Sequence, residues 1–468
     1  MWICSGAVGS YRLRPDTHGN KEVDSGTYRS RVRGALITRS FVDRKPLLML
    51  LPALALVVGM GLTELAAGQD WTPSPNLVMT FAASMLGPLV ALLVLNAVDP
   101  NFDWILVATA GMLTTVGTVT LHSLSLAGGV EGAFYQGIAN RHAFFVAAGF
   151  LALIVGAILS RRVDEIRRYP FTLFSMAIVL TASTVIAGQT VNGARLWLRI
   201  GPVQFQPSEV ARLLIAAFVA IYLYDHRHLV VAPWRLGSVD LPPAPYLLPV
   251  AGAVLAAVAV LVFQNDLGMA ALVVLGAFAS IATVLSSKRS LSAAGALLVL
   301  AATAAYAAAP RVRDRVAGWL EPWQDPIGRG FQFVQADYGL AAGGLLGVSN
   351  PVMTARVPEV HTDFILVGVA TQWGLVGAVA VLGLLSILVC RCAYAALKAA
   401  SGLESLLALA LTTLIGIQLL LILGGTLRVA PLTGLTVPLV SSGGTSMIAT
   451  LFAVGVVAGL GTSFARES

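Results

Sequence analysis

Residues 144–159 read FFVAAGFLALIVGAIL, an uninterrupted apolar run of sixteen residues, and the charged stretch SRRVDEIRR follows at 160–168. As a helix the run is about 24 Å long, close to the thickness of the hydrocarbon layer of a bilayer. Backbone groups in lipid must be paired within their own segment, so the run predicts a transmembrane helix. The arginines after it mark the point where the chain leaves the membrane.

Similar runs recur along the whole chain, for example Leu47–Ala67 (interrupted by Glu64), Leu247–Phe263 and Leu406–Leu423. Hydrophobic residues make up 57% and charged residues 11% of the sequence, against about 25% charged in a soluble domain. We therefore predict an all-α fold, a polytopic helical membrane protein with about twelve transmembrane helices. The expected spans lie near 46–67, 76–97, 103–123, 142–160, 170–189, 208–225, 246–263, 266–285, 290–309, 363–390, 406–424 and 443–463.

The net charge of +7 follows this topology. With both termini in the cytoplasm, most Lys and Arg residues fall in short cytoplasmic segments, as the positive-inside rule requires. This distribution argues against nucleic acid as a partner. Residues 1–45 carry many arginines but no apolar signal region, so we expect a disordered basic tail near anionic lipid rather than a cleaved signal peptide. Cys4, Cys390 and Cys392 support neither a disulfide framework nor a zinc site.

Three segments between spans have the composition of functional loops: 189–207, 310–362 and 431–446. The second is rich in Gly, charge and aromatic residues, which predicts a long, folded extracellular loop that partly re-enters the membrane. The third places two Pro and three Gly in an apolar context, where irregular backbone is tolerated only inside protein or along a cavity.

Several polar residues in these segments allow both a structural and a functional interpretation. In NGARLWLR (192–199), Arg195 and Arg199 either anchor the chain at the interface or hold an anionic lipid headgroup through bidentate hydrogen bonds. The following QPSE (206–209) predicts a helix start, with Glu209 in the first turn. In QNDLG (264–268), capping of the next helix by Asp266 is favoured over a functional role.

The long loop contains WLEPWQDPIGRGFQ at 319–332. Asp325 either starts a turn before proline or serves as general base for a sugar hydroxyl. In PEVHTDFI (358–365), His361 and Asp363 make only a weak metal pattern. Helix capping by Thr362 or Asp363 is the default there.

Together with PLTGLTVPLVSSGGTS at 431–446, these blocks resemble the SEDS family (shape, elongation, division and sporulation), whose members include RodA and FtsW. The resemblance runs from about residue 103 to the C-terminus. The family core has ten spans, so residues 46–98 resemble an N-terminal addition of two helices, as in actinobacterial members, and 99–468 the core.

The resemblance implies an inverting peptidoglycan glycosyltransferase that polymerises lipid II and releases undecaprenyl pyrophosphate. It implies that Asp325 is the catalytic base. It further implies a class B penicillin-binding protein as partner, within the elongation or division machinery, and allows a divalent cation (Mg or Mn). The substrate-binding residues carried over from the blocks are Arg195, Arg199, Gln206, Glu209, Arg212, Glu321, Gln332, His361, Asp363, Ser441 and Ser446.

The sequence departs from the family pattern at Asn265, Thr371, Gln372, Ser442 and Thr445, where the family has Pro, Glu, Glu, Tyr and Ser, and it has Arg212 for Lys. Two other readings stay open: a lipid II flippase or transporter, built on the same broken helices, and a non-catalytic scaffold for the penicillin-binding protein. The sequence does not separate elongation from division.

Overall fold

The computed structural model describes residues 45–66, 75–191, 193–201, 203–230, 234–236, 239–241, 244–285, 288–348 and 350–462. The chain divides into two units, Met1–Leu48 and Met49–Ser468. Apart from the first four residues of α2, all features discussed below belong to the second unit. The predicted basic tail and its disorder lie outside the described residues, except for Lys45, where α2 begins.

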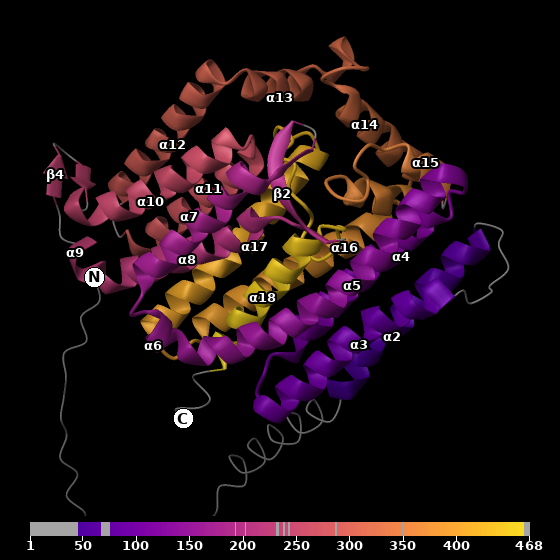
Figure 1. The fold of residues 1–468 in the computed structure, drawn as a ribbon, viewed down its shortest axis with the longest axis horizontal. Helices are drawn as coiled ribbons and strands as arrows, with labels where there is room; N and C mark the ends of the chain where they lie inside the picture. Colours follow the sequence, from indigo (N-terminus) through magenta and orange to yellow (C-terminus); the bar gives the residue numbers. More distant parts are fainter. Residues whose placement is uncertain are drawn as a thin grey trace, which may run out of the picture. The chain divides into compact units, whose positions relative to one another are not determined.

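Each of the twelve predicted spans coincides with a long helix in the described part of the chain (Figure 1). These helices are α2 (Lys45–Ala66), α3 (Pro75–Val98), α4 (Trp104–Ser125), α5 (Gly129–Leu159), α7 (Pro170–Ala187), α8 (Pro207–Asp225), α10 (Ala244–Phe263), α11 (Leu267–Val284), α12 (Lys288–Ala308), α16 (Ile365–Leu397), α17 (Gly402–Thr426) and α18 (Gly444–Gly461). The all-α fold class is confirmed.

Among the described residues, ten helices are long and apolar enough to cross a membrane. The apolar parts of α2 and α10 are shorter, Leu51–Thr63 and Leu248–Phe263. The helices therefore match the expected segments, while the number of crossings stays a prediction.

One boundary differs clearly from the prediction, because α5 begins at Gly129 rather than near residue 142. The additional turns mix apolar and polar residues, and Gln136 donates a hydrogen bond to Asn140 one turn later at 3.0 Å. Arg141 donates to the Gly137 carbonyl in the same way. Such local bonds continue a helix beyond its apolar stretch, which hydropathy alone does not detect.

The fold also contains two small antiparallel sheets that the sequence analysis did not predict. Strands β1 (Gln189–Val191), β2 (Ala194–Ile200) and β3 (Val203–Phe205) form one sheet in that order, with Arg199 opposite Gln204. Strands β4 (Trp234–Leu236) and β5 (Val239–Leu241) form the other. The first sheet occupies the predicted functional segment before α8.

Small residues allow the central helices to approach closely. A Cβ atom on Gly455 of α18 would lie 2.0 Å from the Leu153 carbonyl oxygen of α5, and one on Gly156 would lie 2.4 Å from the Phe452 oxygen. Close packing through glycine is typical of helix pairs in membranes, where burial from water contributes little between helices. The N-terminal helices join this packing, since Leu56 and Met60 of α2 contact Val119 of α4.

The segment between α12 and α16 contains short helices and turns. It contains α13 (Pro310–Leu320), the short turn η2 (Pro322–Gln324), α14 (Phe331–Gly343) and α15 (Pro351–Ala355). Residues 344–348 pair with α16 where that helix is interrupted at Gly374, whose φ is 70°. The predicted partial entry of residues 310–362 into the bilayer stays a prediction.

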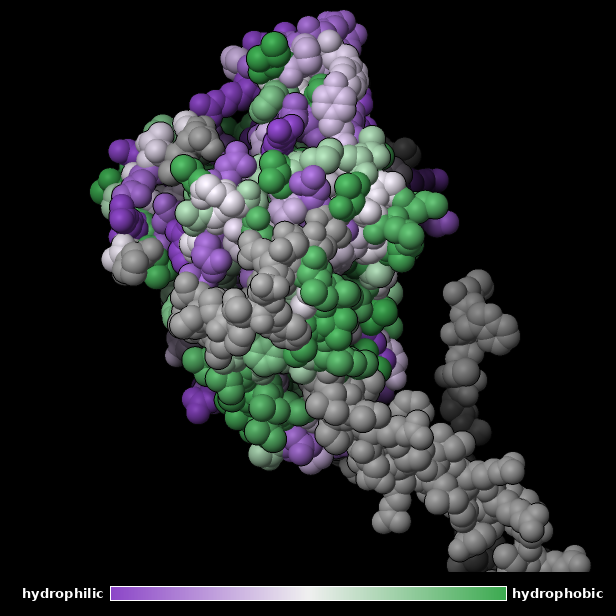
Figure 2. All heavy atoms as spheres, turned by 90° about the vertical axis from the view of Figure 1, so that its right-hand side faces the viewer, coloured by the Kyte–Doolittle hydropathy of each residue, from purple (hydrophilic) through white to green (hydrophobic). Residues whose placement is uncertain are grey.

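The surface is divided by polarity. In Figure 2 hydrophilic side chains gather toward one end of the visible face, and hydrophobic side chains cover much of the face below them. Large apolar side chains such as Leu297 and Val299 of α12 and Val179 of α7 are exposed by about two thirds. An apolar belt below a polar end is the surface expected of a membrane-embedded bundle.

The remaining short helices follow the C-terminal ends of two long helices. The turn η1 (Ser160–Arg162) and α6 (Val163–Ile166) follow α5, and α9 (Arg227–Val230) follows α8.

Candidate functional site

The three segments chosen from the sequence meet at one end of the bundle, together with the turns before α11 and α16. The Arg195 backbone N–H donates to the Gln264 carbonyl, and the Gln206 N–H donates to Thr445 Oγ1 at 3.0 Å. Arg315 of α13 donates to the carbonyls of Leu432 and Thr433 at 3.3 and 3.2 Å. Loops far apart in the sequence thus form a single site.

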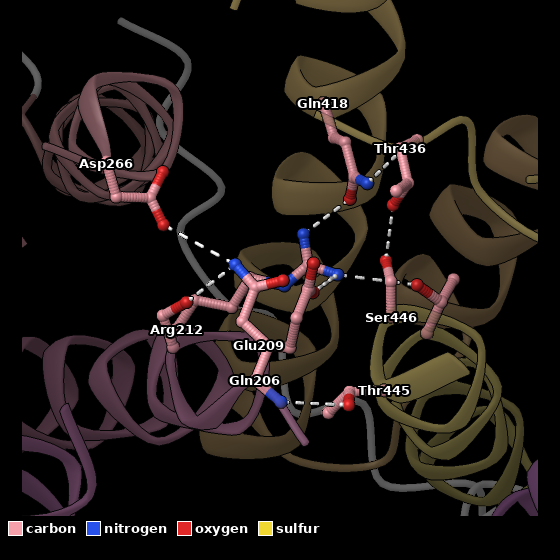
Figure 3. A network of polar contacts seen from close by, with 10 residues as sticks. Gln206, Glu209, Arg212, Asp266, Gln418, Thr436, Thr445 and Ser446 are labelled. Carbon is pink, nitrogen blue, oxygen red and sulfur yellow. Dashed lines mark hydrogen bonds and ion pairs between the residues drawn. The ribbon is translucent and has the colours of Figure 1, made fainter. Parts of the chain in front are cut away.

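A buried polar network forms the base of this site (Figure 3). Glu209 and Arg212, one turn apart at the start of α8, form an ion pair of 2.8 Å, and each residue is only 3% exposed. Arg212 also donates to Gln418 Oε1 of α17 at 2.5 Å. Carboxylate and guanidinium are thus removed from water together, which is tolerated only when both have partners.

The network continues into the glycine-rich segment before α18. Gln418 donates to the Thr436 carbonyl at 2.7 Å, and Thr436 Oγ1 donates to Ser446 at 2.8 Å. Arg212 reaches Thr450 of α18 at 3.4 Å. The predicted binding residues Glu209, Arg212 and Ser446 are therefore brought together.

Gln206 connects this network with the turn before α11. It is the N-cap residue of α8, and its amide donates to Ser208 at 3.1 Å and to Asp266 Oδ2 at 3.5 Å. The predicted helix start at QPSE is confirmed. Figure 3 shows Gln206 lying between Asp266 and Thr445.

Asp266 caps α11, as the sequence analysis favoured, because its Oδ1 accepts from the Met269 N–H at 3.0 Å. Asp266 also has an unusual pKa. Burial raises the pKa of Asp266 to about 6, against the lowering effect of the Met269 hydrogen bond. A carboxyl group with a pKa near neutrality, facing Gln206, is able to exchange protons at the site.

Asp363 lies just before α16, but the predicted capping role is wrong. The N-cap position belongs to Phe364, and no side chain there accepts from the helix, while Thr362 Oγ1 donates to the Glu359 carboxylate instead. Burial, and next the charge of Glu359, raise the pKa of Asp363 to about 7. The turn places Asp363 inward, with Oδ2 3.7 Å from the position of a Cβ on Gly434.

Arg315 is a site residue that the sequence analysis missed. It is half-buried, and the charges of both Asp266 and Asp363 act on its guanidinium, against burial that lowers its pKa. The buried carboxyl group of Asp266, the partly buried one of Asp363 and the guanidinium of Arg315 therefore surround the junction of α11, α13 and α16. No sequence spacing links these residues, since they come from three separate segments.

Asp325 lies in a solvent-exposed turn after η2, in the segment between α12 and α16. Its Oδ1 accepts from the Gly328 N–H and its Oδ2 from the Arg329 N–H, both at 3.0 Å. The Arg329 side chain adds an ion pair at 3.5 Å, and the Asp325 side chain is 45% exposed. These bonds, first that from the Arg329 N–H, hold the pKa of Asp325 below its ordinary value. The turn-forming role considered from the sequence is thus observed, and the carboxylate stays ionised.

The other two predicted residues of this block do not join the buried network. Glu321 is exposed at the start of η2, and Gln332 is partly exposed in the first turn of α14. Neither forms a side-chain hydrogen bond within the described structure.

Arg195 and Arg199 are exposed on β2. Arg195 donates to the Gly188 and Val185 carbonyls at 3.1 and 3.0 Å, which satisfies the C-terminal end of α7. Arg199 donates to the Gly201 carbonyl within its own hairpin at 3.2 Å. The structure therefore gives both residues an anchoring role, and each keeps further N–H donors for a ligand.

Two of the predicted binding residues, Ser441 and His361, hold the segment before α16 and the segment before α18 together. Ser441 donates to the Thr362 carbonyl at 2.6 Å and accepts from the Val437 N–H. The His361 carbonyl accepts from both the backbone and the side chain of Ser442, at 2.9 and 2.8 Å. Ser441 is thus structural.

Burial lowers the pKa of His361, which keeps its ring neutral near pH 7. Its ring lies edge-on to Phe134 and Tyr135, and Nδ1 is buried with no hydrogen-bond partner among the described residues. In the described part of the chain, no group of three His, Cys, Asp or Glu gathers to hold a metal ion.

The sequence of this chain matches a known protein family. The family of cell cycle proteins that unites FtsW, RodA and SpoVE matches residues 103–464. This chain belongs to the FtsW/RodA/SpoVE family. The match confirms the resemblance to the SEDS family, which the loop blocks had placed from about residue 103.

Named relatives in the FtsW/RodA/SpoVE family are 28–30% identical to this chain over the aligned residues. Peptidoglycan glycosyltransferase RodA of Mycobacterium tuberculosis is 30% identical over 365 residues, which cover 77% of this chain and 78% of the relative. Stage V sporulation protein E of Bacillus subtilis is 28% identical over 363 residues, which cover 76% and 95%.

Solved structures of the family have the same fold. A chain of a peptidoglycan synthase complex, described for its coordination of polymerization and crosslinking, is 32% identical with a TM-score of 0.63, and the match covers 77% of this chain and 98% of that one. The rod shape determining protein RodA of Thermus thermophilus is 28% identical with a TM-score of 0.54, covering 79% and 98%.

Two departures from the family pattern are packed into the helix core here. Thr371 Oγ1 donates to the Gly339 and Val367 carbonyls, and Gln372 to the Thr120 carbonyl at 3.5 Å. Both are at most 1% exposed. Two buried neutral side chains thus lie next to the break in α16.

Proposed function

We propose that this chain is a peptidoglycan glycosyltransferase that polymerises lipid II with release of undecaprenyl pyrophosphate. The 4-hydroxyl of the acceptor sugar attacks the anomeric carbon of the donor, and the configuration there inverts. The observation that carries the proposal is the convergence of the loop segments before α8, α11, α16 and α18 on one cluster of carboxyl and guanidinium groups, to which α13 adds Arg315.

Orientation follows from charge. The loop blocks lie at one end of the spans, and the basic residues Arg161, Arg162, Lys288, Arg391 and Lys398 lie at the helix ends opposite to them. Basic ends favour the cytoplasmic side. We infer that the termini are cytoplasmic and that the site opens outside, where the glycan is assembled.

The reaction requires positive charge for the leaving pyrophosphate. Arg315 meets this requirement best, because it is half-buried and close to the polar network, where electrostatic interactions are stronger than in water. Arg195 and Arg199 supply further donors from β2 at the rim. Arg212 acts indirectly, since its guanidinium is engaged with Glu209 and Gln418.

The reaction also requires a proton acceptor for the attacking hydroxyl. We assign this role to Asp325. Its carboxylate is ionised and partly exposed, and Oδ1, which accepts only the Gly328 N–H among the described residues, keeps a lone pair for the hydroxyl proton. The hydrogen bonds from Gly328 and Arg329 fix its orientation, which favours positioning at the cost of basicity.

Among the described residues, no group of three His, Cys, Asp or Glu could hold a metal ion. A partner is inferred from the structural neighbour, which belongs to a complex of polymerization and crosslinking. We propose that a class B penicillin-binding protein fills the crosslinking role here.

The test of the catalytic assignment compares two carboxylates that contact the same arginine. Asp325→Asn should reduce lipid II polymerisation by the purified chain with its partner by about 10²–10⁴-fold. The control is Asp314→Asn, because Asp314 is exposed on α13 and pairs with Arg329 at 3.7 Å. It should keep polymerisation within about twofold.

Equal loss in both variants would reduce Asp325 to an electrostatic partner of Arg329. Full activity of Asp325→Asn would remove it from the mechanism. A flippase is the second candidate, because the broken backbone before α18 and in α16 is typical of transporters. Transport of lipid II across vesicles without polymer would favour it.

A further inference from the structure

A pocket with polar and apolar lining residues lies at the other end of the bundle, away from the proposed catalytic site. It has a volume of about 740 Å³ and is bounded by the C-terminal ends of α8 and α11, by α9 and by the first turns of α17. Val284, Leu406 and Leu409 form its apolar side, and Arg227, His228 and Ser405 its polar side. A pocket with one apolar and one basic side fits an amphipathic ligand.

The guanidinium of Arg227 is held in place inside this pocket. It stacks on the Tyr224 ring at 4.0 Å from the centroid, and its Nη1 donates to the Tyr224 carbonyl at 2.8 Å. Stacking and one hydrogen bond orient the planar group and leave its other N–H groups available for a ligand.

The nearby carboxylates are already engaged. Asp225 pairs with Arg167 at 2.7 Å. Glu404, next to the pocket in sequence, accepts from the backbone N–H groups of Ala400 and Ser401 at 3.1 and 3.3 Å in the capping box of α17. Among the described residues, no carboxylate forms an ion pair with Arg227 or His228, so in this part of the chain the charge of Arg227 has no ion-pair partner.

We propose that this pocket binds the phosphate headgroup of an anionic phospholipid, with one acyl chain along Leu406, Leu409 and Val284. The pocket lies at the basic end of the spans, which faces the leaflet rich in anionic lipid. Arg227 donates to the phosphate oxygens, and His228 and Ser405 contribute at the rim.

Binding at this position affects the helices that form the site. The pocket joins α8, α11 and α17, and the opposite ends of the same three helices carry Glu209, Asp266 and Gln418. A lipid that binds the folded bundle and not the unfolded chain raises its stability. We therefore expect phospholipid occupancy to be measurable as thermal stabilisation.

The test uses the purified full chain in detergent micelles, titrated with phosphatidylglycerol, phosphatidylcholine or inorganic phosphate, with the melting temperature as readout. Phosphatidylglycerol should raise the melting temperature and phosphatidylcholine should not. Arg227→Gln should weaken the apparent affinity for phosphatidylglycerol about tenfold, a change of about 1.4 kcal/mol.

Arg162→Gln is the matched control, because Arg162 lies at the same end of the bundle, pairs with the exposed Glu165 at 3.8 Å and does not line the pocket. It should leave the phosphatidylglycerol response unchanged. If Arg227→Gln does not fold, Ser405→Glu tests the same pocket by adding negative charge and should weaken the response.

Three outcomes would overturn the proposal. An equal response of Arg227→Gln (or of Ser405→Glu) and the wild-type chain would exclude the pocket. An equal response to phosphatidylcholine would exclude charge recognition. Stabilisation by inorganic phosphate as large as that by phosphatidylglycerol would exclude the lipid as the specific ligand.

Discussion

Replacement of Arg212 by Met tests the buried network most sharply. Arg212 and Glu209 are both 3% exposed, and the ion pair between them measures 2.8 Å. Met keeps much of the apolar stem but removes the charge, so Glu209 stays buried without its partner and Gln418 loses a donor. Breaking one side of a buried pair costs about 3–5 kcal/mol.

Removal of both charges should cost much less than removal of one. The double variant Glu209→Gln/Arg212→Met leaves no isolated charge, and an apolar or neutral replacement of a buried pair is often nearly neutral. The coupling energy from the double-mutant cycle should therefore be about 2–4 kcal/mol.

The free energy of unfolding is measured by titration with a denaturing detergent, followed by tryptophan fluorescence. Arg199→Met serves as the control, because Arg199 is exposed and its side chain bonds only the Gly201 carbonyl. It should change stability by less than about 0.5 kcal/mol. A loss below about 1 kcal/mol for Arg212→Met, with no coupling to Glu209→Gln, would refute the reasoning.

Two further predictions concern protonation and packing. The pKa of Asp363 is raised to about 7 in the folded chain and is about 3.9 in the unfolded chain. The folded state therefore binds the proton more tightly than the unfolded state. The free energy of unfolding should fall as pH rises from about 4 to 7, by up to about 4 kcal/mol. Denaturant titrations at pH 5 and 8 should show this fall in the wild type and a smaller one in Asp363→Asn; equal falls would contradict the burial of its charge. Gly455→Val places side-chain atoms against the Leu153 carbonyl, 2.0 Å from the Cβ position, and should destabilise the α5–α18 pair by about 1–3 kcal/mol or more; wild-type stability of this variant would contradict the close approach.

The helical framework was predictable because its physical cause is local. Apolar runs such as 144–159 report the thickness of a membrane directly, and each expected span falls on a long helix. The start of α5 at Gly129 was missed because it depends on side-chain bonds such as Gln136–Asn140 rather than on hydropathy. The β1–β3 sheet was missed because its strands are short and pair only with each other.

The site was predictable in its segments but not in its geometry. The QPSE helix start and the Asp266 cap follow from local rules, and both are observed. Arg315 could not be chosen from the sequence, because its position near Asp266 and Asp363 depends on the packing of α13 against distant loops. Asp363 was expected to cap α16 because it directly precedes an apolar run. The cap does not form because the preceding turn, in which Glu359 has a φ of 51°, directs the chain differently from a regular helix start.

The central claim is most directly tested by lipid II turnover in the purified wild-type chain with its penicillin-binding partner. We expect conversion of lipid II to a β-1,4 glycan that lysozyme digests, with one undecaprenyl pyrophosphate released for each disaccharide added. Lipid II that is bound or moved across vesicles, with no polymer and no released pyrophosphate carrier, would contradict the assignment as a glycosyltransferase.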